Sequence, residues 1–503
     1  MTNYIFLKKT VFFFCMIYIL IISCSQSFPK KTSNIQDLLE VLKDLDEERG
    51  LRNGTWSFSL KSVKNEETII NHNADKSVII ASNMKVVTTA AALDVLGEDF
   101  TFQTFLEYDG DILSDGTLKG NIYIRGGGDP TLGSRRVKGS LNTNEIFDLW
   151  AKKIHDFGIR RITGSIIADA DFFEENAVPS GWTWGDMGNY YGAAAFGLNL
   201  NDNMYRLTFK SAKDEGAPTS ILKIDPQIPG LTVTSTVKTG KSTSGDNAYI
   251  YGSMYGNYQF IEGTIPSGIP EFSIRGAIPD VPKTTSILFY QKLSRNKITV
   301  SGEATTTRIL RMQGKSVNDQ RKIIYMHISP SLREIVYQTN LYSMNLYAEA
   351  IAKMIGKKVS SDGSTVGGVN AIRNHWYQKG IKNAGFFLKD GCGLSRSNAT
   401  TTSQLTDILL YMSKQPVFGT FYNSLPVAGA SGTMSPIARG TIAAGNLRAK
   451  TGSIERVKSY TGYFRSQSGE LYAFSMVAND YEMESEILEE KIEKIMVTMA
   501  QLQ

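Results

Sequence analysis

Hydrophobic residues follow a helical spacing near both ends of the chain. Leucine and isoleucine recur three or four residues apart over 35–45, and residues 82–96 are rich in Ala, Val and Leu. The segment 343–356 and the amphipathic stretch 487–502 have the same spacing. A glycine stands at or just beyond the end of the first three segments, where helices commonly stop. The pattern predicts four helices, with the one over 82–96 buried.

Alternation of apolar and polar residues predicts strands elsewhere. It indicates a hairpin over 56–71. Two further strands, 459–464 and 471–478, are predicted on either side of a Ser-Gly turn. Between 100 and 325, short alternating runs are separated by Gly, Pro and Asn-Asp, which indicates a strand-rich region with few helices. Helical ends around such a middle suggest one domain interrupted by a long insertion.

The first 23 residues have the pattern of a signal peptide. Two lysines precede an apolar run over 11–22, which is shorter than the ~20 residues that span a bilayer. The run ends in Ser-Cys24, which resembles a bacterial lipobox and implies acylation of Cys24, and residues 24–34 are a polar tether. We expect a periplasmic protein held by lipid in the outer membrane, which Ser25 favours by analogy. The alternatives are a soluble periplasmic form after cleavage, and a retained anchor or buried helix.

Composition and charge narrow the class of protein. The 503 residues are 42% hydrophobic and 20% charged, which excludes a mainly disordered or coiled-coil chain and suggests about two to four domains. Lys and Arg number 54 against 49 Asp and Glu, and this net charge of +5 is not gathered into basic clusters. We therefore expect no nucleic-acid partner. Three cysteines are too few for a disulfide framework or a Cys-rich zinc site.

Candidate metal and phosphate motifs are weak. The four histidines lack a second ligand at metal-binding spacing, and an acidic cluster lacks the spacing of a calcium loop. The Gly-rich run 126–130 lacks a following helix, which favours a turn. We expect no metal and no cofactor. The residues concerned are His72, His155, His327 and His375, and Asp169, Asp171, Glu174 and Glu175.

One serine carries a lysine three residues later at the start of an apolar helix. Ser82 and Lys85 would share one helical face, where loss of hydration lowers the pKa of an amine so that it can accept a seryl proton. The same spacing at 27–30 lies in the tether, and at Ser294 and Lys297 it runs into a strand-like stretch. Context therefore favours Ser82 as a nucleophile.

Two further motifs follow in order. Ser343-Met-Asn345 opens a predicted helix, and Lys450-Thr-Gly-Ser precedes the predicted strand pair. Glycine behind the Lys-Thr pair would let a substrate backbone lie against the strand edge. The similar Lys-Thr-Gly at 238–240 precedes any Ser-x-Asn that opens a helix. Each motif alone is more often structural, but the three in this order favour catalysis.

The set Ser-x-x-Lys, Ser-x-Asn and Lys-Thr-Gly resembles that of penicillin-recognising serine enzymes. The gap of 343 − 82 = 261 residues between the first two motifs resembles class C low-molecular-mass penicillin-binding proteins, the D-alanyl-D-alanine carboxypeptidase/endopeptidases. Six further stretches agree with that family: 128–132, 164–169, 181–184, 198–203, 390–395 and 425–429.

The resemblance implies an α+β fold. A β-lactamase-like catalytic domain, with helices on an antiparallel sheet, would be formed by residues 35–99 and 325–503. Two nested, mainly β domains would be inserted, one from 100–171 and 276–324 and the other from 172–275.

The resemblance also implies roles. Ser82 would form the acyl-enzyme, Lys85 would be the general base, Ser343 would relay a proton to the leaving amine, and Lys450 would supply positive charge. Peptidoglycan peptides would be substrates and β-lactams covalent inhibitors. The substrate-binding residues would be Asn345, Thr451, Gly452 and Ser453.

Two residues depart from the family pattern. Ser453 stands where Thr is common and keeps the hydroxyl, while Cys392 stands where Ser is usual and keeps the small size. A β-lactamase, an esterase or D-amino-acid amidase, and a non-catalytic cell-wall-binding lipoprotein are alternatives. The intact Ser82, Lys85 and Lys450 argue against the last. The sequence favours neither carboxypeptidase nor endopeptidase action, and it predicts no oligomeric state.

Overall fold

The computed structural model describes residues 34–503. The predicted signal peptide, Cys24 and all but the last residue of the tether lie outside this range. Within it, no helix is both long enough and apolar enough to cross a bilayer.

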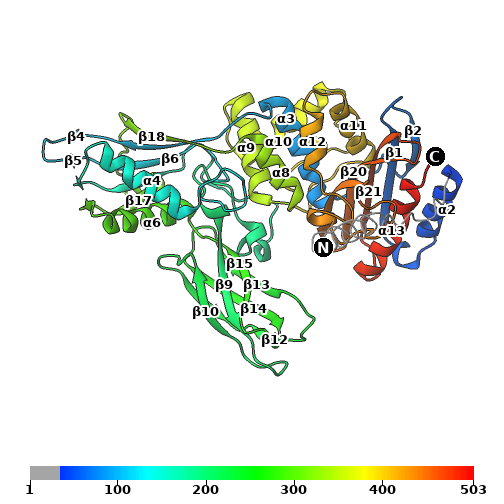
Figure 1. The fold of residues 1–503 in the computed structure, drawn as a ribbon, viewed down its shortest axis with the longest axis horizontal. Coiled ribbons are helices and arrows are strands. Elements are labelled where there is room, and N and C mark those ends of the chain that lie inside the picture. The colour runs from blue at the N-terminus through cyan, green and yellow to red at the C-terminus, as the bar shows by residue number, and fades with distance from the viewer. Residues whose placement is uncertain (1–33) are drawn as a thin grey trace, which may run out of the picture.

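An antiparallel sheet joins the two ends of the chain. Its strand order is β19-β20-β21-β1-β2, so strands from the N-terminal and C-terminal segments are neighbours (Figure 1). The predicted hairpin and the predicted strand pair are both present in it. The strands are β1 (Thr55–Ser62), β2 (Thr68–His72), β19 (Arg448–Ile454), β20 (Val457–Arg465) and β21 (Leu471–Asn479).

Helices cover both faces of this sheet. On one face, α2 (Ile35–Asp46) and α13 (Ser485–Ala500) pack together, as the amphipathic spacing predicts, with Leu38 and Ile492 buried in their shared core. On the other face lies α3 (Met84–Leu96), which is buried from Met84 to Leu93. The result is a three-layer arrangement of helices, sheet and helices.

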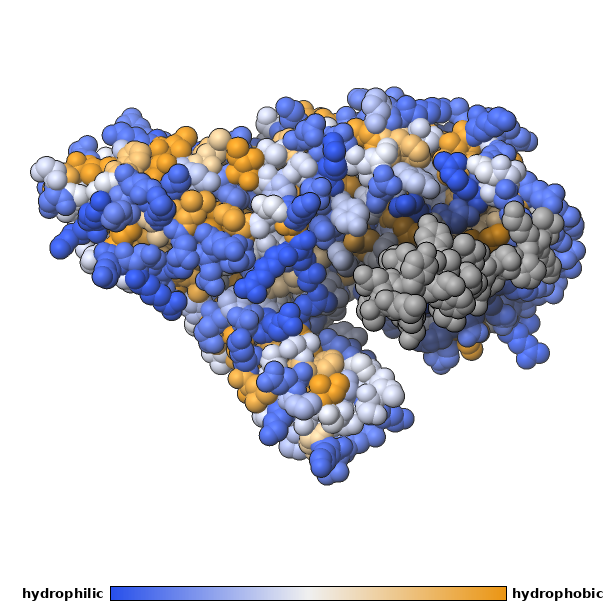
Figure 2. Space-filling model, in the orientation of Figure 1, coloured by the Kyte–Doolittle hydropathy of each residue, from blue (hydrophilic) through white to orange (hydrophobic). Residues whose placement is uncertain are grey.

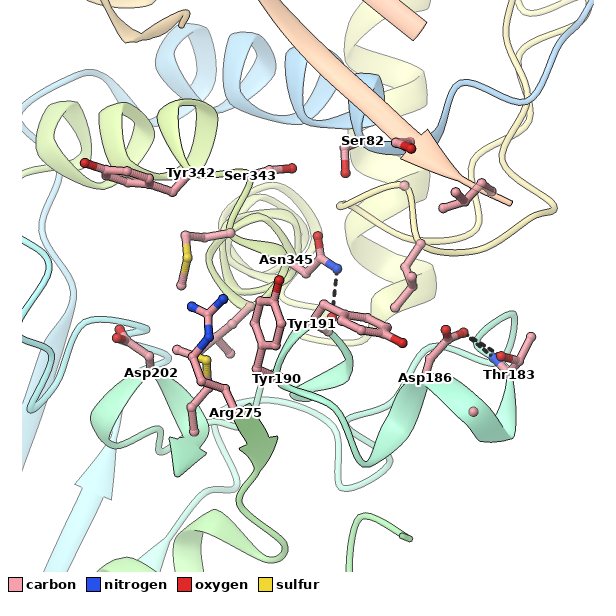
Figure 3. A pocket seen from close by; sticks show the side chains of 18 of the residues that line it. Ser82, Thr183, Asp186, Tyr190, Tyr191, Asp202, Arg275, Tyr342, Ser343 and Asn345 are labelled. Atoms are coloured by element: carbon pink, nitrogen blue, oxygen red, sulfur yellow. Dashed lines mark hydrogen bonds between the residues drawn. The ribbon is translucent and has the colours of Figure 1, made fainter. Parts of the chain in front are cut away.

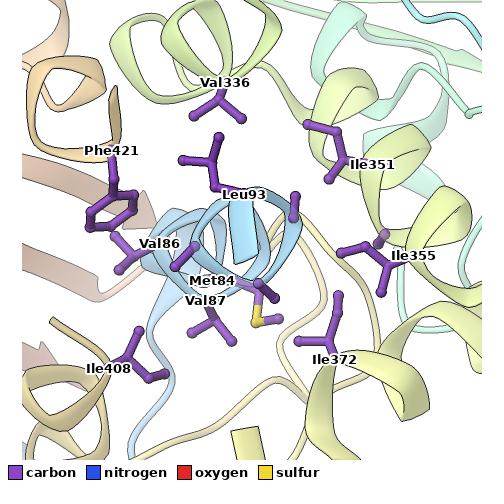
Figure 4. Packing of buried hydrophobic residues seen from close by; sticks show 14 of the residues in the cluster. Met84, Val86, Val87, Leu93, Val336, Ile351, Ile355, Ile372, Ile408 and Phe421 are labelled. Carbon is purple, nitrogen blue, oxygen red and sulfur yellow. The ribbon is translucent and has the colours of Figure 1, made fainter. Parts of the chain in front are cut away.

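Helix α3 is apolar on every side, and helices and strands surround it. Such a helix must be central, and each large apolar side chain buried there stabilises the fold by roughly 1.5–3 kcal/mol. Figure 4 shows its side chains surrounded by residues of the neighbouring helices. The helices on this side of the sheet are α8 (Leu332–Leu341), α9 (Asn345–Ser360), α10 (Thr365–Gln378), α11 (Thr402–Ser413) and α12 (Phe418–Ser424).

Helix α9 begins two residues later and ends four residues later than the predicted 343–356 segment. Gly356 does not terminate it, because a Cβ there would lie 2.6 Å from the backbone of Asp362 and Gly368. The glycine is present because α10 packs closely against α9, not because the helix stops.

The first inserted region contains more helix than its alternating pattern predicts. Its sheet has the order β17-β8-β6-β3-β18, and a smaller sheet has the order β16-β7-β5-β4. Helices α4 (Thr143–Asp156) and α6 (Val281–Arg295) cover it, with Trp150 and Phe289 in their core. The remaining elements are β3 (Gln103–Tyr108), β4 (Asp111–Ile112), β5 (Thr117–Lys119), β6 (Ile122–Gly126), β7 (Arg161–Ile162), β8 (Ile166–Asp169), β16 (Thr299–Val300), β17 (Ala304–Thr306), α7 (Thr307–Met312) and β18 (Lys322–Ile328).

The expected boundary at residue 325 falls inside β18. This strand pairs with β3 over its whole length, so residues 325–328 belong to the inserted sheet. The boundary was misplaced because the alternating pattern does not show with which sheet a strand pairs. We propose that the second catalytic segment begins at residue 329.

A second inserted region forms a separate β-rich lobe. Two small sheets, β10-β9-β15 and one built around β14, project from the body of the molecule (Figures 1 and 2). A short helix, α5 (Trp184–Met187), and the 3₁₀ turn η3 (Tyr190–Gly192) connect this lobe to the rest. Its strands are β9 (Met204–Lys210), β10 (Ser220–Asp225), β11 (Thr232–Ser235), β12 (Lys238–Gly240), β13 (Asn247–Gly252), β14 (Tyr258–Pro266) and β15 (Phe272–Ala277).

Candidate active site

Ser82 lies at the point where a 3₁₀ turn runs into α3. The turn, η2 (Ala81–Asn83), directly precedes Met84, and Ala81 has a φ of 45°, a left-handed conformation that is unusual for a residue with a Cβ. Such strain persists only where the surroundings hold it. It places Ser82 half-buried at the wall of a cleft.

Lys85 lies one helical turn beyond Ser82 and is completely buried. Its Nζ is 3.0 Å from Ser82 Oγ, 2.6 Å from Asn345 Oδ1 and 2.7 Å from the Cys392 carbonyl oxygen. Burial lowers the pKa of Lys85, against the opposing influence of Cys392 and Asp390. An amine whose neutral form is favoured, at hydrogen-bond distance from a hydroxyl, can accept the hydroxyl proton.

Strand β19 lies against the Ser82 turn and is the edge strand of its sheet. A Cβ on Gly452 would lie 2.2 Å from Ser459 Oγ, 2.7 Å from the Ile80 carbonyl oxygen and 3.0 Å from the Ser82 amide nitrogen. Ser459 Oγ also donates to the Ile80 carbonyl at 2.7 Å. Glycine at 452 therefore lets the strand edge approach the nucleophile.

Lys450 is completely buried on the same strand. Its Nζ donates to the carbonyl oxygen of Thr451 at 2.6 Å. Burial lowers the pKa of Lys450 well below its usual value, and the charge of nearby Lys85 lowers it further. Two ammonium groups so close together repel, so the site favours fewer than two protons on the pair.

Ser343 and Asn345 lie where α8 gives way to α9. Ser343 has a φ of 57°, and its hydroxyl points toward Ser82 (Figure 3). The Oδ1 atom of Asn345 accepts from Lys85, and its Nδ2 donates to the carbonyl oxygen of Tyr191 at 2.7 Å. Asn345 thus holds the amine in place and links the helix to the inserted region.

The cleft in front of Ser82 has a volume of about 900 Å³. Ser82, Ser343, Asn345 and Ser453 line it, so four of the residues predicted from sequence share one cavity. Lys85, Lys450, Thr451 and Gly452 are not among its lining residues. The two lysines are completely buried, and Thr451 Oγ1 donates to Thr433 Oγ1 of the cleft wall. The inserted region supplies the opposite wall with Tyr190, Tyr191, Tyr249, Tyr251 and Arg275.

A buried acidic cluster beneath Lys85 escaped sequence analysis. Glu349, Asp390 and Cys392 bring potential ligand atoms within 4.8 Å of one another. Burial and the charge of Asp390 raise the pKa of Glu349 to about 8, so at neutral pH this carboxyl holds a proton. The only signal in the sequence is the stretch 390–395, which agrees with the family pattern.

The same cluster does not suit a metal ion. The Asp390 carboxylate already accepts from four N–H groups, which leaves few lone pairs for a cation. Burial raises the pKa of the Cys392 thiol well above its usual value, which disfavours the thiolate that metals bind. The backbone carbonyl of Cys392, rather than its thiol, contacts Lys85.

The weaker motifs occupy structural positions. The acidic cluster that lacks calcium-loop spacing is held by ion pairs: Asp169 with Arg321 at 2.6 Å, Asp171 and Glu175 with Arg311, and Glu174 with Lys353 at 3.3 Å. The Lys-Thr-Gly at 238–240 is strand β12 in the β-rich lobe, paired with β14.

Known proteins share the family and the fold of this chain. A family model described as the D-Ala-D-Ala carboxypeptidase 3 (S13) family matches residues 36–502. The D-alanyl-D-alanine carboxypeptidase of Actinomadura sp. (strain R39) is 27% identical over 459 residues, covering 88% of this chain and 82% of the relative. The D-alanyl-D-alanine carboxypeptidase DacB of Haemophilus influenzae is 24% identical over 468 residues, covering 92% and 91%.

A solved structure agrees with the architecture. Penicillin binding protein 4 (dacB) from Haemophilus influenzae superposes with a TM-score of 0.76 at 22% identity, covering 93% of this chain and 98% of the other. A structure of the same protein complexed with a β-lactam gives a TM-score of 0.71 at 21% identity, covering 92% and 97%. The similarity confirms the predicted α+β fold with inserted regions.

Proposed function

The chain belongs to the D-Ala-D-Ala carboxypeptidase 3 (S13) family, and from this premise we propose that it is a penicillin-sensitive serine peptidase acting on the D-alanyl-D-alanine ends and cross-links of peptidoglycan peptides. One observation carries the proposal. A desolvated amine, Lys85 Nζ, lies 3.0 Å from Ser82 Oγ at the wall of a cleft that also contains Ser343 and the β19 edge.

Acylation would begin at Ser82. Its Oγ attacks the carbonyl carbon between two D-alanines, and neutral Lys85 accepts the hydroxyl proton as the new C–O bond forms. The proton then passes by way of Ser343 to the leaving amine as the C–N bond breaks. Water hydrolyses the resulting ester, which releases the shortened peptide and restores the Ser82 hydroxyl.

The strand edge would hold the substrate and stabilise the developing oxyanion. A peptide lying along β19 can hydrogen-bond to the free side of this edge strand. The amide of Ser82, beside Gly452, and the amide of Ser453 would donate to the oxyanion. Loss of one such donor typically costs ~10²–10³ in rate.

Lys450 would recognise the terminal carboxylate of the substrate. In the free protein its pKa lies well below its usual value, so arrival of a carboxylate would raise that pKa and draw a proton onto the amine. The hydroxyls of Thr451 and Ser453 would bind the same carboxylate, which also exists in penicillins.

For Lys450→Ala we expect the kcat/KM for D-alanine release and the penicillin acylation rate to fall by roughly 10–10³-fold, the effect of removing a charged partner from a buried site. Pre-steady-state labelling with fluorescent penicillin measures this. Lys241→Ala, which removes an exposed lysine from the β-rich lobe, is the control. An unchanged kcat/KM would exclude Lys450 from carboxylate recognition.

We place the protein in the periplasm, held by a lipid on Cys24. The support is the apolar run over 11–22 that ends in a lipobox-like Ser-Cys. Cys24→Ala is expected to move the protein from the membrane to the soluble fraction of cells, as measured by fractionation and immunoblotting. If the variant stays with the membrane and the unmodified protein carries no lipid by mass spectrometry, the anchor is wrong.

A direct assay tests the proposed activity. Purified protein is incubated with a disaccharide pentapeptide and with a cross-linked dimer, and released D-alanine and monomer are quantified by chromatography. The proposal predicts that both reactions are inhibited by penicillin. Rapid turnover of nitrocefin without action on either peptide would instead identify a β-lactamase.

A further inference from the structure

A second cleft, of about 700 Å³, adjoins the Ser82 cleft. Its walls come from both inserted regions: the start of α4, strands β9 and β15, the far half of α6, and the loop 225–231. The two clefts share Arg136, Asp202, Met204 and Arg275, so a single ligand can contact both. The proposed acylation and carboxylate recognition at Ser82 and Lys450 do not use the second cleft.

The second cleft is strongly basic. Its lining contains six cationic side chains and two acidic ones, which is notable in a chain with a net charge of only +5. Asp202 offsets only Arg136, with which it forms an ion pair, and Asp225 Oδ2 lies 3.5 Å from the Nζ atom of Lys223, which is outside the lining. The cations are Arg135, Arg136, Arg206, Arg275, Lys292 and Arg295.

Three of these cations are exposed and have no acidic partner. Within residues 34–503, the side chains of Arg135, Arg206 and Arg295 make neither an ion pair nor a side-chain hydrogen bond, whereas Lys292 pairs with Asp148 at 2.6 Å. A guanidinium stays charged at all physiological pH values and presents a fork of N–H donors that matches a carboxylate or phosphate. The cleft is therefore suited to an anionic ligand.

The wall shared by the two clefts is rigid. Arg136 Nε lies 3.1 Å from Asp202 Oδ2, and Asp202 Oδ1 accepts from the buried hydroxyl of Tyr347 at 2.6 Å. Tyr347 belongs to α9, two residues after Asn345, which contacts Lys85. The basic cleft is thus fixed directly to the helix that organises the candidate active site.

We propose that the second cleft binds carboxylates of the peptidoglycan peptides at a distance from the bond that Ser82 cleaves. This inference rests on the proposed function and extends its substrate from one peptide end to a larger, multiply charged piece of cell wall. Phosphate-bearing polymers share the relevant chemistry, so the test separates the two sources.

The test compares two triple variants. Arg135→Gln/Arg206→Gln/Arg295→Gln removes the unpaired cations, and Arg52→Gln/Arg161→Gln/Lys315→Gln removes three exposed cations outside both clefts. Binding to insoluble peptidoglycan, stripped of covalently attached phosphate polymers, is measured by co-sedimentation at low and high salt. The control residues are exposed and line neither cleft.

The first variant is expected to bind roughly tenfold more weakly at low salt and to lose most of its salt dependence, while the control behaves as the unmodified protein. Amidation of the free carboxylates should remove the difference between the two variants. Labelling by fluorescent penicillin should stay unchanged in both, because a small acylating agent does not need the second cleft.

Equal binding of the two variants to the stripped peptidoglycan would overturn the inference, as would a difference that survives amidation. A tenfold loss seen only on material that retains its phosphate polymers would also overturn it in favour of phosphate. If the triple variant loses penicillin labelling, Arg206→Gln alone is tested instead. Its binding to stripped peptidoglycan is expected to weaken about threefold, and unchanged binding would contradict the inference. Failure of the unmodified protein to be labelled would refute the proposed function instead.

Discussion

Ser82→Ala is expected to abolish both penicillin labelling and D-alanine release. Removing a serine nucleophile from a serine peptidase typically lowers kcat by about six orders of magnitude. The hydroxyl is 3.0 Å from Lys85 Nζ, and no other hydroxyl lies within hydrogen-bond distance of that amine among residues 34–503. Fluorescent penicillin followed by gel imaging, together with a D-alanine assay, measures both losses.

Ser294→Ala is the matched control for this variant. Ser294 and Lys297 have the same Ser-x-x-Lys spacing, but Ser294 Oγ donates to the Tyr290 carbonyl near the end of α6, and Ser294 is exposed. This variant should be labelled as fast as the unmodified protein. If Ser82→Ala has the melting temperature of the unmodified protein and is still labelled by penicillin, Ser82 is not the nucleophile.

Lys85→Met is expected to lower the acylation rate by roughly 10²–10⁴-fold, the usual contribution of a general base. Burial lowers the pKa of Lys85 below its usual value of 10.5, so the neutral, proton-accepting form is gained as pH rises. Acylation of the unmodified protein should therefore speed up as pH rises through that pKa. In Lys85→Met the rising part should disappear.

The pH profile separates chemistry from packing. Met fills most of the volume of the lysine stem, so a purely structural role would leave a slower reaction with the same pH dependence. Lys297→Met, from the second Ser-x-x-Lys pair, should change neither the rate nor the profile. If Lys85→Met keeps the rising part, another group is the base.

Much of the fold could be predicted because local patterns determine it. The buried helix over 82–96 is specified by its apolar content, and the two strands after Lys450 by strand-like runs on either side of a Ser-Gly turn. Helix α4 was missed although its apolar residues recur at helical spacing after an Asn cap, and α6 was missed because polar residues interrupt its apolar positions. The end of α9 was misplaced because Gly356 serves the packing of α10, which only the tertiary structure reveals.

The candidate site was predictable to the extent that its residues stand in short motifs. Ser82, Ser343, Asn345 and Ser453 do meet in one cleft. Glu349 and the tyrosine-rich wall were not predicted, because they reach the site through side-chain contacts between segments distant in sequence. The expected contact of Asn345 with substrate also needs revision, since both polar atoms of its side chain are occupied in the free protein.

The most direct measurement is peptide mapping of the protein after brief exposure to penicillin. Because the buried amine of Lys85 lies next to the Ser82 hydroxyl beside the β19 edge, we expect one penicilloyl group per chain. It should be bound as an ester to the proteolytic peptide that contains Ser82. An intact protein that gains no mass, or an adduct found on a peptide lacking Ser82, would contradict the account.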